Sequence, residues 1–130
     1  SGGVYLGGTG AANKLDDYES GTFSATSSAT GTNSVVSERY TKIGNTVHVY
    51  FQVDFSGGSG DLTVSGLPFN ASVTAVGIGR EDVSNGYAIY GRINTNSSSL
   101  SLWYAAGLSN APPFQVAAGN FKFSITYEAA

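Results

Sequence analysis

The sequence has no cysteine, no methionine and a single histidine, His48, in 130 residues. Without cysteine there is no disulfide framework, so packing or oligomerisation must stabilise the fold. One histidine is too few for a zinc site within a chain, and no motif places a serine nucleophile beside it. We therefore expect no catalytic residue, no metal and no cofactor in the single chain. Because Met is absent even at position 1, we also expect a piece of a longer or processed chain.

Charge is also scarce, because charged residues make up only 12% of the chain, with nine acids and six bases. The lysines and arginines are scattered singly, whereas nucleic-acid binding needs clustered positive charge. No apolar run approaches the roughly 20 residues that a membrane-spanning helix requires. We expect neither a nucleic-acid partner nor membrane insertion.

Glycoside hydrolysis would require two carboxylates about 5 to 9.5 Å apart. The acids available for such a pair are Glu38, Asp54, Asp61, Glu81 and Asp82. Adjacent Glu81 and Asp82 should point to opposite faces of a strand, which argues against that pair. The phosphate-binding glycine motifs and the calcium-loop motif are absent from the sequence. The chain is therefore not expected to be an enzyme.

The strongest pattern present is alternation with a period of two. In residues 46–55, Val47, Val49, Phe51, Val53 and Phe55 alternate with polar residues, which predicts a strand with one buried face. Eight strands are expected, near residues 22–26, 36–43, 46–55, 61–66, 73–82, 87–93, 99–105 and 120–127, with residues 114–117 as a candidate ninth. The pairs at 44–45, 85–86 and 119–120 predict hairpin turns.

Short antiparallel strands joined by hairpins favour an all-β fold, an antiparallel β-sandwich with a jelly-roll-like arrangement. An up-and-down barrel is the alternative. Residues 1–20 are rich in glycine and predict a neck or arm, whereas residues 21–130 predict the sandwich head domain. Residues 27–34 contain only small polar residues, Ala and Gly apart from Asn33, and predict a loop or a weak edge strand.

Aromatic and polar residues gather in the second half of the chain. Saccharide sites combine aromatic platforms with a few polar groups, so this region is the candidate ligand site. Alternation places Tyr90, Arg92 and Trp103 off the core face of their strands. Burial of these aromatics at a subunit interface is the alternative. The candidate ligand-binding residues are Arg80, Asp82, Asn85, Tyr87, Tyr90, Arg92, Trp103 and Phe114.

Four segments occur in the order GVYLGGTGAANKLDDYESGTF, RYTKIGN, VSGLPF and FSITYEA, at residues 3–23, 39–45, 64–69 and 123–129. In this order the sequence resembles the C-terminal head domains of tailed-bacteriophage tail fibres, particularly those of marine phages. The resemblance covers nearly the whole chain, with its specific motifs in 5–23, 40–45 and 66–69. One departure is SGTF at residues 20–23, where the family more often has EGTW.

The resemblance implies a non-enzymatic homotrimer at a fibre tip that binds a host cell-surface glycan or receptor. The protein would be part of the virion and would assemble in the host bacterial cytoplasm. A trimerisation cap without receptor binding and a carbohydrate-active spike domain are the alternatives. In a trimer, three copies of His48 on the axis are the one arrangement that would hold a metal.

A homotrimer would also explain the acidic segment LDDYE. Near a threefold axis its acids would repel one another unless Lys14 or Arg39 pairs with them. We expect a trimer joint made by Lys14, Leu15, Asp16, Asp17, Tyr18 and Glu19. In this joint Leu15, Tyr18 and Phe23 would pack inward. The alternative is a solvated polar turn, because isolated surface ion pairs contribute only about 0 to 1 kcal/mol.

Overall fold

The computed structural model describes residues 4–5, 14–15, 17–28, 31–58, 62–82, 86–104 and 116–130. Within these residues every regular element is a strand. The strands are β1 (Val4–Tyr5), β2 (Lys14–Leu15), β3 (Tyr18–Gly21), β4 (Thr26–Ser27), β5 (Thr32–Ile43), β6 (Thr46–Gly58), β7 (Leu62–Ser65), β8 (Ala75–Glu81), β9 (Ala88–Ile93), β10 (Ser99–Tyr104) and β11 (Val116–Glu128). The described part of the chain contains no helix long and apolar enough to cross a membrane.

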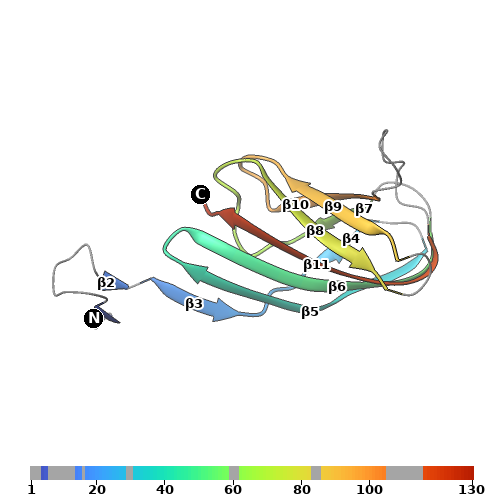
Figure 1. The fold of residues 1–130 in the computed structure, drawn as a ribbon, viewed down its shortest axis with the longest axis horizontal. Coiled ribbons are helices and arrows are strands. Elements are labelled where there is room, and N and C mark those ends of the chain that lie inside the picture. The colour runs from blue at the N-terminus through green and yellow to red at the C-terminus, as the bar shows by residue number, and fades with distance from the viewer. Residues whose placement is uncertain are drawn as a thin grey trace.

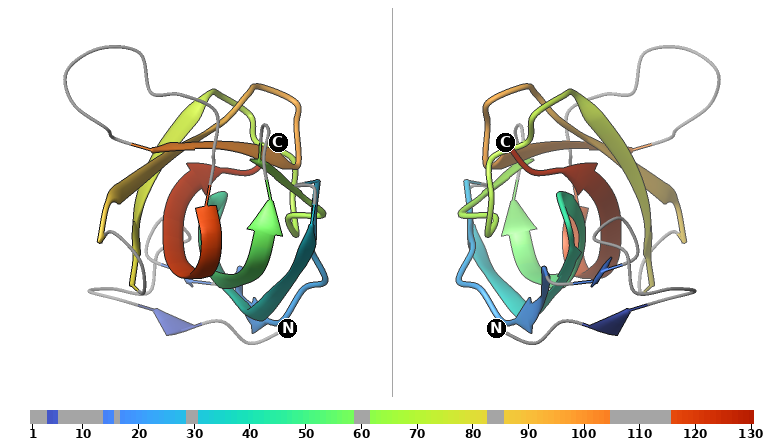
Figure 2. Two further views of the ribbon diagram at one scale, coloured as in Figure 1. Left: turned by 90° about the vertical axis from the view of Figure 1, so that its right-hand side faces the viewer. Right: turned by 90° about the vertical axis from the view of Figure 1, so that its left-hand side faces the viewer.

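Nine strands form one sheet in the order β3-β5-β6-β11-β8-β9-β10-β7-β4, and every neighbouring pair is antiparallel. The sheet curls around its own concave face, as the end-on views in Figure 2 show. The curl brings β4, at one edge, into contact with β5 near the other. There the Ser27 hydroxyl donates a hydrogen bond to Oδ1 of Asn33. The predicted all-β antiparallel class is confirmed, in the form of one continuous curled sheet.

The core lies on the concave face, and its centre is the long pairing of β6 with β11 (Figure 1). Phe51 lies opposite Phe123 with ring centroids 5.6 Å apart, and both are buried. Phe55 and Phe121 pack at 6.2 Å one layer further along. Fully burying a side chain of this kind stabilises the fold by about 1.5 to 3 kcal/mol. The alternation expected in residues 46–55 is therefore confirmed as the inner face of β6.

Two glycines of β8 and one of β9 let the sheet pack closely against this core. A β-carbon on Gly79 would come within 2.2 Å of the Lys122 carbonyl oxygen and 2.8 Å of Phe123 Cδ2. One on Gly91 would come within 2.8 Å of Phe123 Cζ. Gly77 lies directly opposite Gly91 and is equally crowded, by Ile125. From Ala75 to Gly79 the inward face of β8 is thus made of small residues, so that the β11 side chains can reach it, and Glu81 is the last inward residue of the strand.

The hairpin predicted at residues 44–45 is confirmed, since β5 and β6 pair across it and Gly44 has a φ of 59°. The turn predicted at residues 119–120 is wrong. Gly119 and Asn120 continue β11 and pair with Phe55 and Asp54 of β6, because β6 extends to Gly58 and requires a partner along its length. The candidate strand at 114–117 is consequently, from Val116 on, the start of β11.

The strand predicted at residues 22–26 is also placed wrongly. The structure has β3 before it and the short β4 at its end, with residues 22–25 between them. This segment joins β3 to β4, the two edge strands of the sheet, so it has no strand partner of its own. Residues 27–34 were predicted as a loop or a weak edge strand; Ser27 ends the edge strand β4, and β5 begins at Thr32.

The predicted neck divides into two parts. Strands β1 and β2 pair only with each other, in a separate two-stranded sheet. Strand β3 instead pairs with the end of β5, Tyr18 opposite Ile43 and Gly21 opposite Tyr40. Residues 18–21 therefore belong to the nine-stranded sheet, although the sequence analysis assigned most of them to the predicted neck.

Candidate recognition surface

The convex face of β8, β9 and β10 exposes large apolar side chains. Val76 is 73% exposed, Ile78 65% and Tyr90 41%. Ile78 lies opposite Tyr90, and Tyr90 lies opposite Trp103, so these three side chains form one row across the strands. We call Val76, Ile78, Tyr90 and Trp103 the apolar row surface. A contiguous exposed apolar patch of this kind on a soluble domain is typical of a binding or subunit interface.

Tyr90 and Trp103 stack on each other within this surface. Their ring centroids lie 5.6 Å apart with an angle of 24° between the planes. The Arg92 guanidinium carbon lies 5.7 Å from the centroid of the Trp103 ring, within the range of a cation–π contact. Val76, Tyr90, Gly91, Arg92 and Trp103 line a hollow of about 270 Å³. The sequence placed Tyr90, Arg92 and Trp103 off the core face, and the structure has all three outside the buried core.

Two other cations, Lys122 and Arg80, lie on the same side of the sheet as Arg92 but outside the residues that line the hollow. Lys122 of β11 donates to the Asp82 carboxylate, and this ion pair raises the pKa of the lysine. Arg80 lies against Gly86, where an added β-carbon would come within 3.3 Å of Nη2. Asp82 and Arg80 are thus exposed on the same side of the sheet as Arg92, outside the hollow that it lines.

Glu81 and Asp82 point to opposite faces, as the sequence predicted. Glu81 is completely buried, and its carboxylate accepts a hydrogen bond of 2.9 Å from the Gly86 amide. Its own amide donates to the Tyr87 carbonyl at 3.0 Å. Glu81 thereby fixes the start of β9. Tyr87 itself is 45% exposed, next to β9 but not in the hollow.

Two of the candidate ligand residues, Asn85 and Phe114, lie outside the described residues. The structure therefore brings Tyr90, Arg92 and Trp103 together and leaves Arg80, Asp82 and Tyr87 around them. Val76 and Ile78 were not among the sequence candidates. Their alternation with Gly77 and Gly79 does not by itself identify the outward face, because the crowding that decides it comes from β11.

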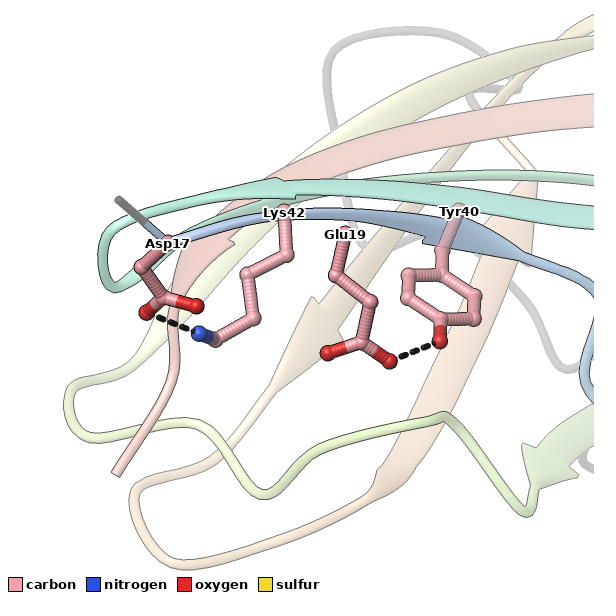
Figure 3. A network of polar contacts seen from close by, with 4 residues as sticks. All are labelled: Asp17, Glu19, Tyr40 and Lys42. Atoms are coloured by element: carbon pink, nitrogen blue, oxygen red, sulfur yellow. Dashed lines mark hydrogen bonds and ion pairs between the residues drawn. The ribbon is translucent and has the colours of Figure 1, made fainter. Parts of the chain in front are cut away.

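The acidic segment finds partners within its own chain (Figure 3). Asp17 accepts a hydrogen bond from Lys42 Nζ at 2.5 Å, and Glu19 accepts one from the Tyr40 hydroxyl. The Glu19 hydrogen bond raises the pKa of Tyr40. Figure 3 shows all four side chains projecting from the β3–β5 pair toward the same side. The sequence named Lys14 or Arg39 as the partner of these acids, whereas in the chain Lys42 takes that role for Asp17.

Lys42 is held in place on its other side by the core. Its ammonium lies 5.7 Å from the centroid of the Phe69 ring, and Tyr40 packs edge-on against the same ring at 5.5 Å. Only 14% of the Lys42 side chain is exposed, against 54% for Asp17. A lysine stem covering an apolar ring while its charged end reaches a carboxylate is a common arrangement.

The apolar residues of the predicted joint are placed unequally. Phe23 packs against the core, as expected, but Tyr18 is 61% exposed in the single chain. Tyr18 lies opposite Ile43, which is exposed as well, so a second apolar pair faces outward at this end of the sheet. Asp16 and the side chains of Lys14 and Leu15 lie outside the described part of the structure.

The described residues also include the histidine and the acids that the sequence analysis weighed for other chemistries. His48 is exposed on the convex face, where Nδ1 lies 2.9 Å from the Thr126 hydroxyl. In the described ranges no three His, Asp or Glu side chains gather closely enough to hold a metal. The residues that line the hollow beside Trp103 include no carboxylate.

Comparison with protein-family models, curated proteins and solved structures finds no match to this chain.

Proposed function

We propose that this chain is the homotrimeric tip domain of a phage tail fibre and that it binds a glycan of the host surface without catalysis. The Tyr90–Trp103 stack is the observation that carries the proposal. The sequence resemblance supports the fibre, the virion location and the trimer, and the jelly-roll description of the head belongs to the same proposal. Of the other candidate ligand residues, Arg92 lines the same hollow as the stack.

A stacked aromatic pair on a sheet suits a sugar for a physical reason. The apolar face of a pyranose ring can cover an aromatic ring while its hydroxyl groups remain at the edge, where protein groups or water can bind them. The hollow of about 270 Å³ is close to the lower end of the roughly 300 to 1,000 Å³ usual for ligand sites. It therefore fits one or two sugar rings rather than a long chain. Because β9 and β10 form part of the continuous sheet, the platform is rigid before binding.

A glycan array tests the proposal directly. We expect the protein to bind a defined set of saccharides and Trp103→Ala and Tyr90→Ala to reduce that binding by tenfold or more. The matched control is Tyr50→Ala, which removes a tyrosine from β6, away from the hollow. Equal binding by the Trp103→Ala and Tyr50→Ala proteins would show that the aromatic pair is not the site.

The trimerisation cap is a second candidate, and the exposure of Val76 and Ile78 favours it. In that case the apolar row surface would be covered by a neighbouring subunit. Ile78 lies outside the hollow, so Ile78→Asp separates the two functions. If the surface is a subunit contact, this variant will lose the trimer in light scattering on a sizing column. If it is a glycan site, the variant will keep its trimer mass.

A further inference from the structure

We infer that the hollow beside Trp103 accepts an anionic saccharide and that Arg92 binds its carboxylate or phosphate group. This inference rests on the proposed function and specifies the class of glycan. Neutral sugars need only the aromatic platform and hydroxyl partners. The charge distribution around the hollow and the placement of Arg92 are what point to an acidic one.

Positive charge is concentrated on this face of an otherwise acidic chain. The net charge is −3, and three of the six lysines and arginines, Lys122, Arg80 and Arg92, lie on the convex face of β11, β8 and β9. The exposed acids on that side are Asp82, next to the end of β8, and Glu128, at the far end of β11. Asp82 neutralises Lys122. Among the described residues neither arginine has an ion pair or a hydrogen bond. The charge that lines the hollow itself is therefore the single positive charge of Arg92, which attracts an anion at short range.

Arg92 is also positioned for a specific contact. Its guanidinium lies against the Trp103 ring, and both side chains line the same hollow. A sugar bound in this hollow, which Tyr90 also lines, would therefore present its ring substituents close to the guanidinium. The planar donor pairs of arginine match a carboxylate or phosphate in a bidentate way, and such charge-assisted bonds are about twice as strong as neutral ones.

No described residue opposes this contact. The residues that line the hollow carry one positive charge and no negative charge. Glu81, the acid at the end of β8, is buried on the other side of the sheet. Asp82, which follows it, is paired with Lys122. An anion in the hollow would thus meet attraction from Arg92 and no carboxylate among the residues that line it.

An array of paired saccharides tests the inference. Each acidic glycan is printed beside its neutral counterpart: hexuronic acid beside hexose, sialylated beside desialylated, and phosphorylated beside unphosphorylated. The proteins are the wild type, Arg92→Gln, Arg92→Lys and Lys122→Gln, each checked for an unchanged thermal melt. Lys122→Gln is the matched control, because it removes a cation from the same face outside the hollow.

We expect the wild type to bind the acidic members roughly ten- to hundredfold more tightly than their counterparts. Arg92→Gln should abolish that preference, so that each acidic member and its neutral counterpart bind with similar affinity, and Arg92→Lys should keep only part of the preference. Lys122→Gln should retain the preference. Whether the carboxylate pairs or the phosphate pairs show the effect identifies the anion.

Three outcomes would overturn the inference. If the wild type binds neutral and acidic members equally through Trp103, the proposed glycan site stands and the role of Arg92 falls. If Arg92→Gln and Lys122→Gln reduce acidic binding equally, a general surface field is responsible and no specific site exists. If no saccharide of either kind is bound, the proposed function and the inference fail together.

Discussion

Replacing Gly79 by alanine tests the packing that shapes the candidate surface. Gly79 is on β8, with its inward side against β11, where the added methyl would lie 2.2 Å from the Lys122 carbonyl oxygen. That atom belongs to the backbone and cannot rotate away, unlike the end of a side chain. Gly79 is not among the glycines with a positive φ, so alanine can adopt its backbone conformation.

Two effects of opposite sign can be weighed for this substitution. Alanine restricts the unfolded chain, which would stabilise the protein by about 0.4 to 1 kcal/mol. Overpacking against a core of normal density costs about 1 to 3 kcal/mol, and displacement of a carbonyl in the β8–β11 ladder adds about 0.5 to 1.5 kcal/mol. The destabilising effects are larger, so we expect the free energy of unfolding to fall by about 2 to 3 kcal/mol. This corresponds to a melting temperature lower by roughly 10 °C.

Thermal unfolding followed by circular dichroism measures this loss. Val76→Ala on the same strand is the control, since its exposed side chain should change stability by only about 0.5 kcal/mol. If Gly79→Ala melts within about 2 °C of the wild type, the sheet can move away from β11 at little cost. The close approach would then not be what determines which face of β8 points outward.

Three further predictions concern other parts of the fold. Ser37 sits at the β5 bulge with a φ of 59°, so Ser37→Gly should stabilise the protein by about 0.5 to 1 kcal/mol in denaturant unfolding, whereas Ser34→Gly on the same strand should destabilise it. If both Ser37→Gly and Ser34→Gly destabilise the protein, the backbone at Ser37 is not strained. Burial raises the pKa of Tyr127 to about 12, above the value near 10 of the unfolded chain, so its contribution to stability is complete below about pH 10 and lost as the pH rises to about 12. Tyr127→Phe should flatten that part of the stability curve, and an unchanged alkaline slope would refute the assignment. Asp17→Asn should lower the free energy of unfolding by no more than about 1 kcal/mol, because Asp17 is half exposed although Lys42 is not, and added salt should reduce this difference. A loss of several kcal/mol would contradict this prediction.

Where one face of a strand carries bulky apolar residues and the other face polar ones, the sequence was sufficient to predict both the strand and its buried side. The alternation in residues 46–55 predicted both the strand β6 and its buried side, since Val49 and Phe51 are fully buried. The same rule placed Tyr90 and Trp103 off the core face, because their neighbours Ile89, Ile93, Leu100 and Leu102 are the inward residues.

The rule is less informative where glycine alternates with apolar residues, as in β8. A reading by hydrophobicity alone would direct Val76 and Ile78 inward, yet both are exposed. The deciding factor is the bulk of Ile125 and Phe123 on the neighbouring strand, which leaves room only for the Gly77 and Gly79 face. Such a dependence involves a strand more than forty residues away along the chain, so no local pattern contains it.

The turn at residues 119–120 and the partner of Asp17 show the same limit. A Gly-Asn pair is compatible with a turn, but pairing with all of β6 keeps Gly119 and Asn120 in β11. Lys42 reaches Asp17 because β3 pairs with the end of β5, which places Glu19 opposite Lys42. Both outcomes follow from long-range register, which the sequence motifs do not specify.

The fluorescence of Trp103 tests the central claim most directly, because it is the only tryptophan in the chain and it lines the hollow. Acrylamide quenching of the assembled protein is measured before and after addition of a saccharide that the protein binds. A recognition site predicts that Trp103 is accessible to the quencher in the assembled protein and becomes shielded when the saccharide is present. A Trp103 that is shielded without saccharide, and that becomes accessible only when dilution dissociates the subunits, would contradict the account and assign the surface to a subunit contact.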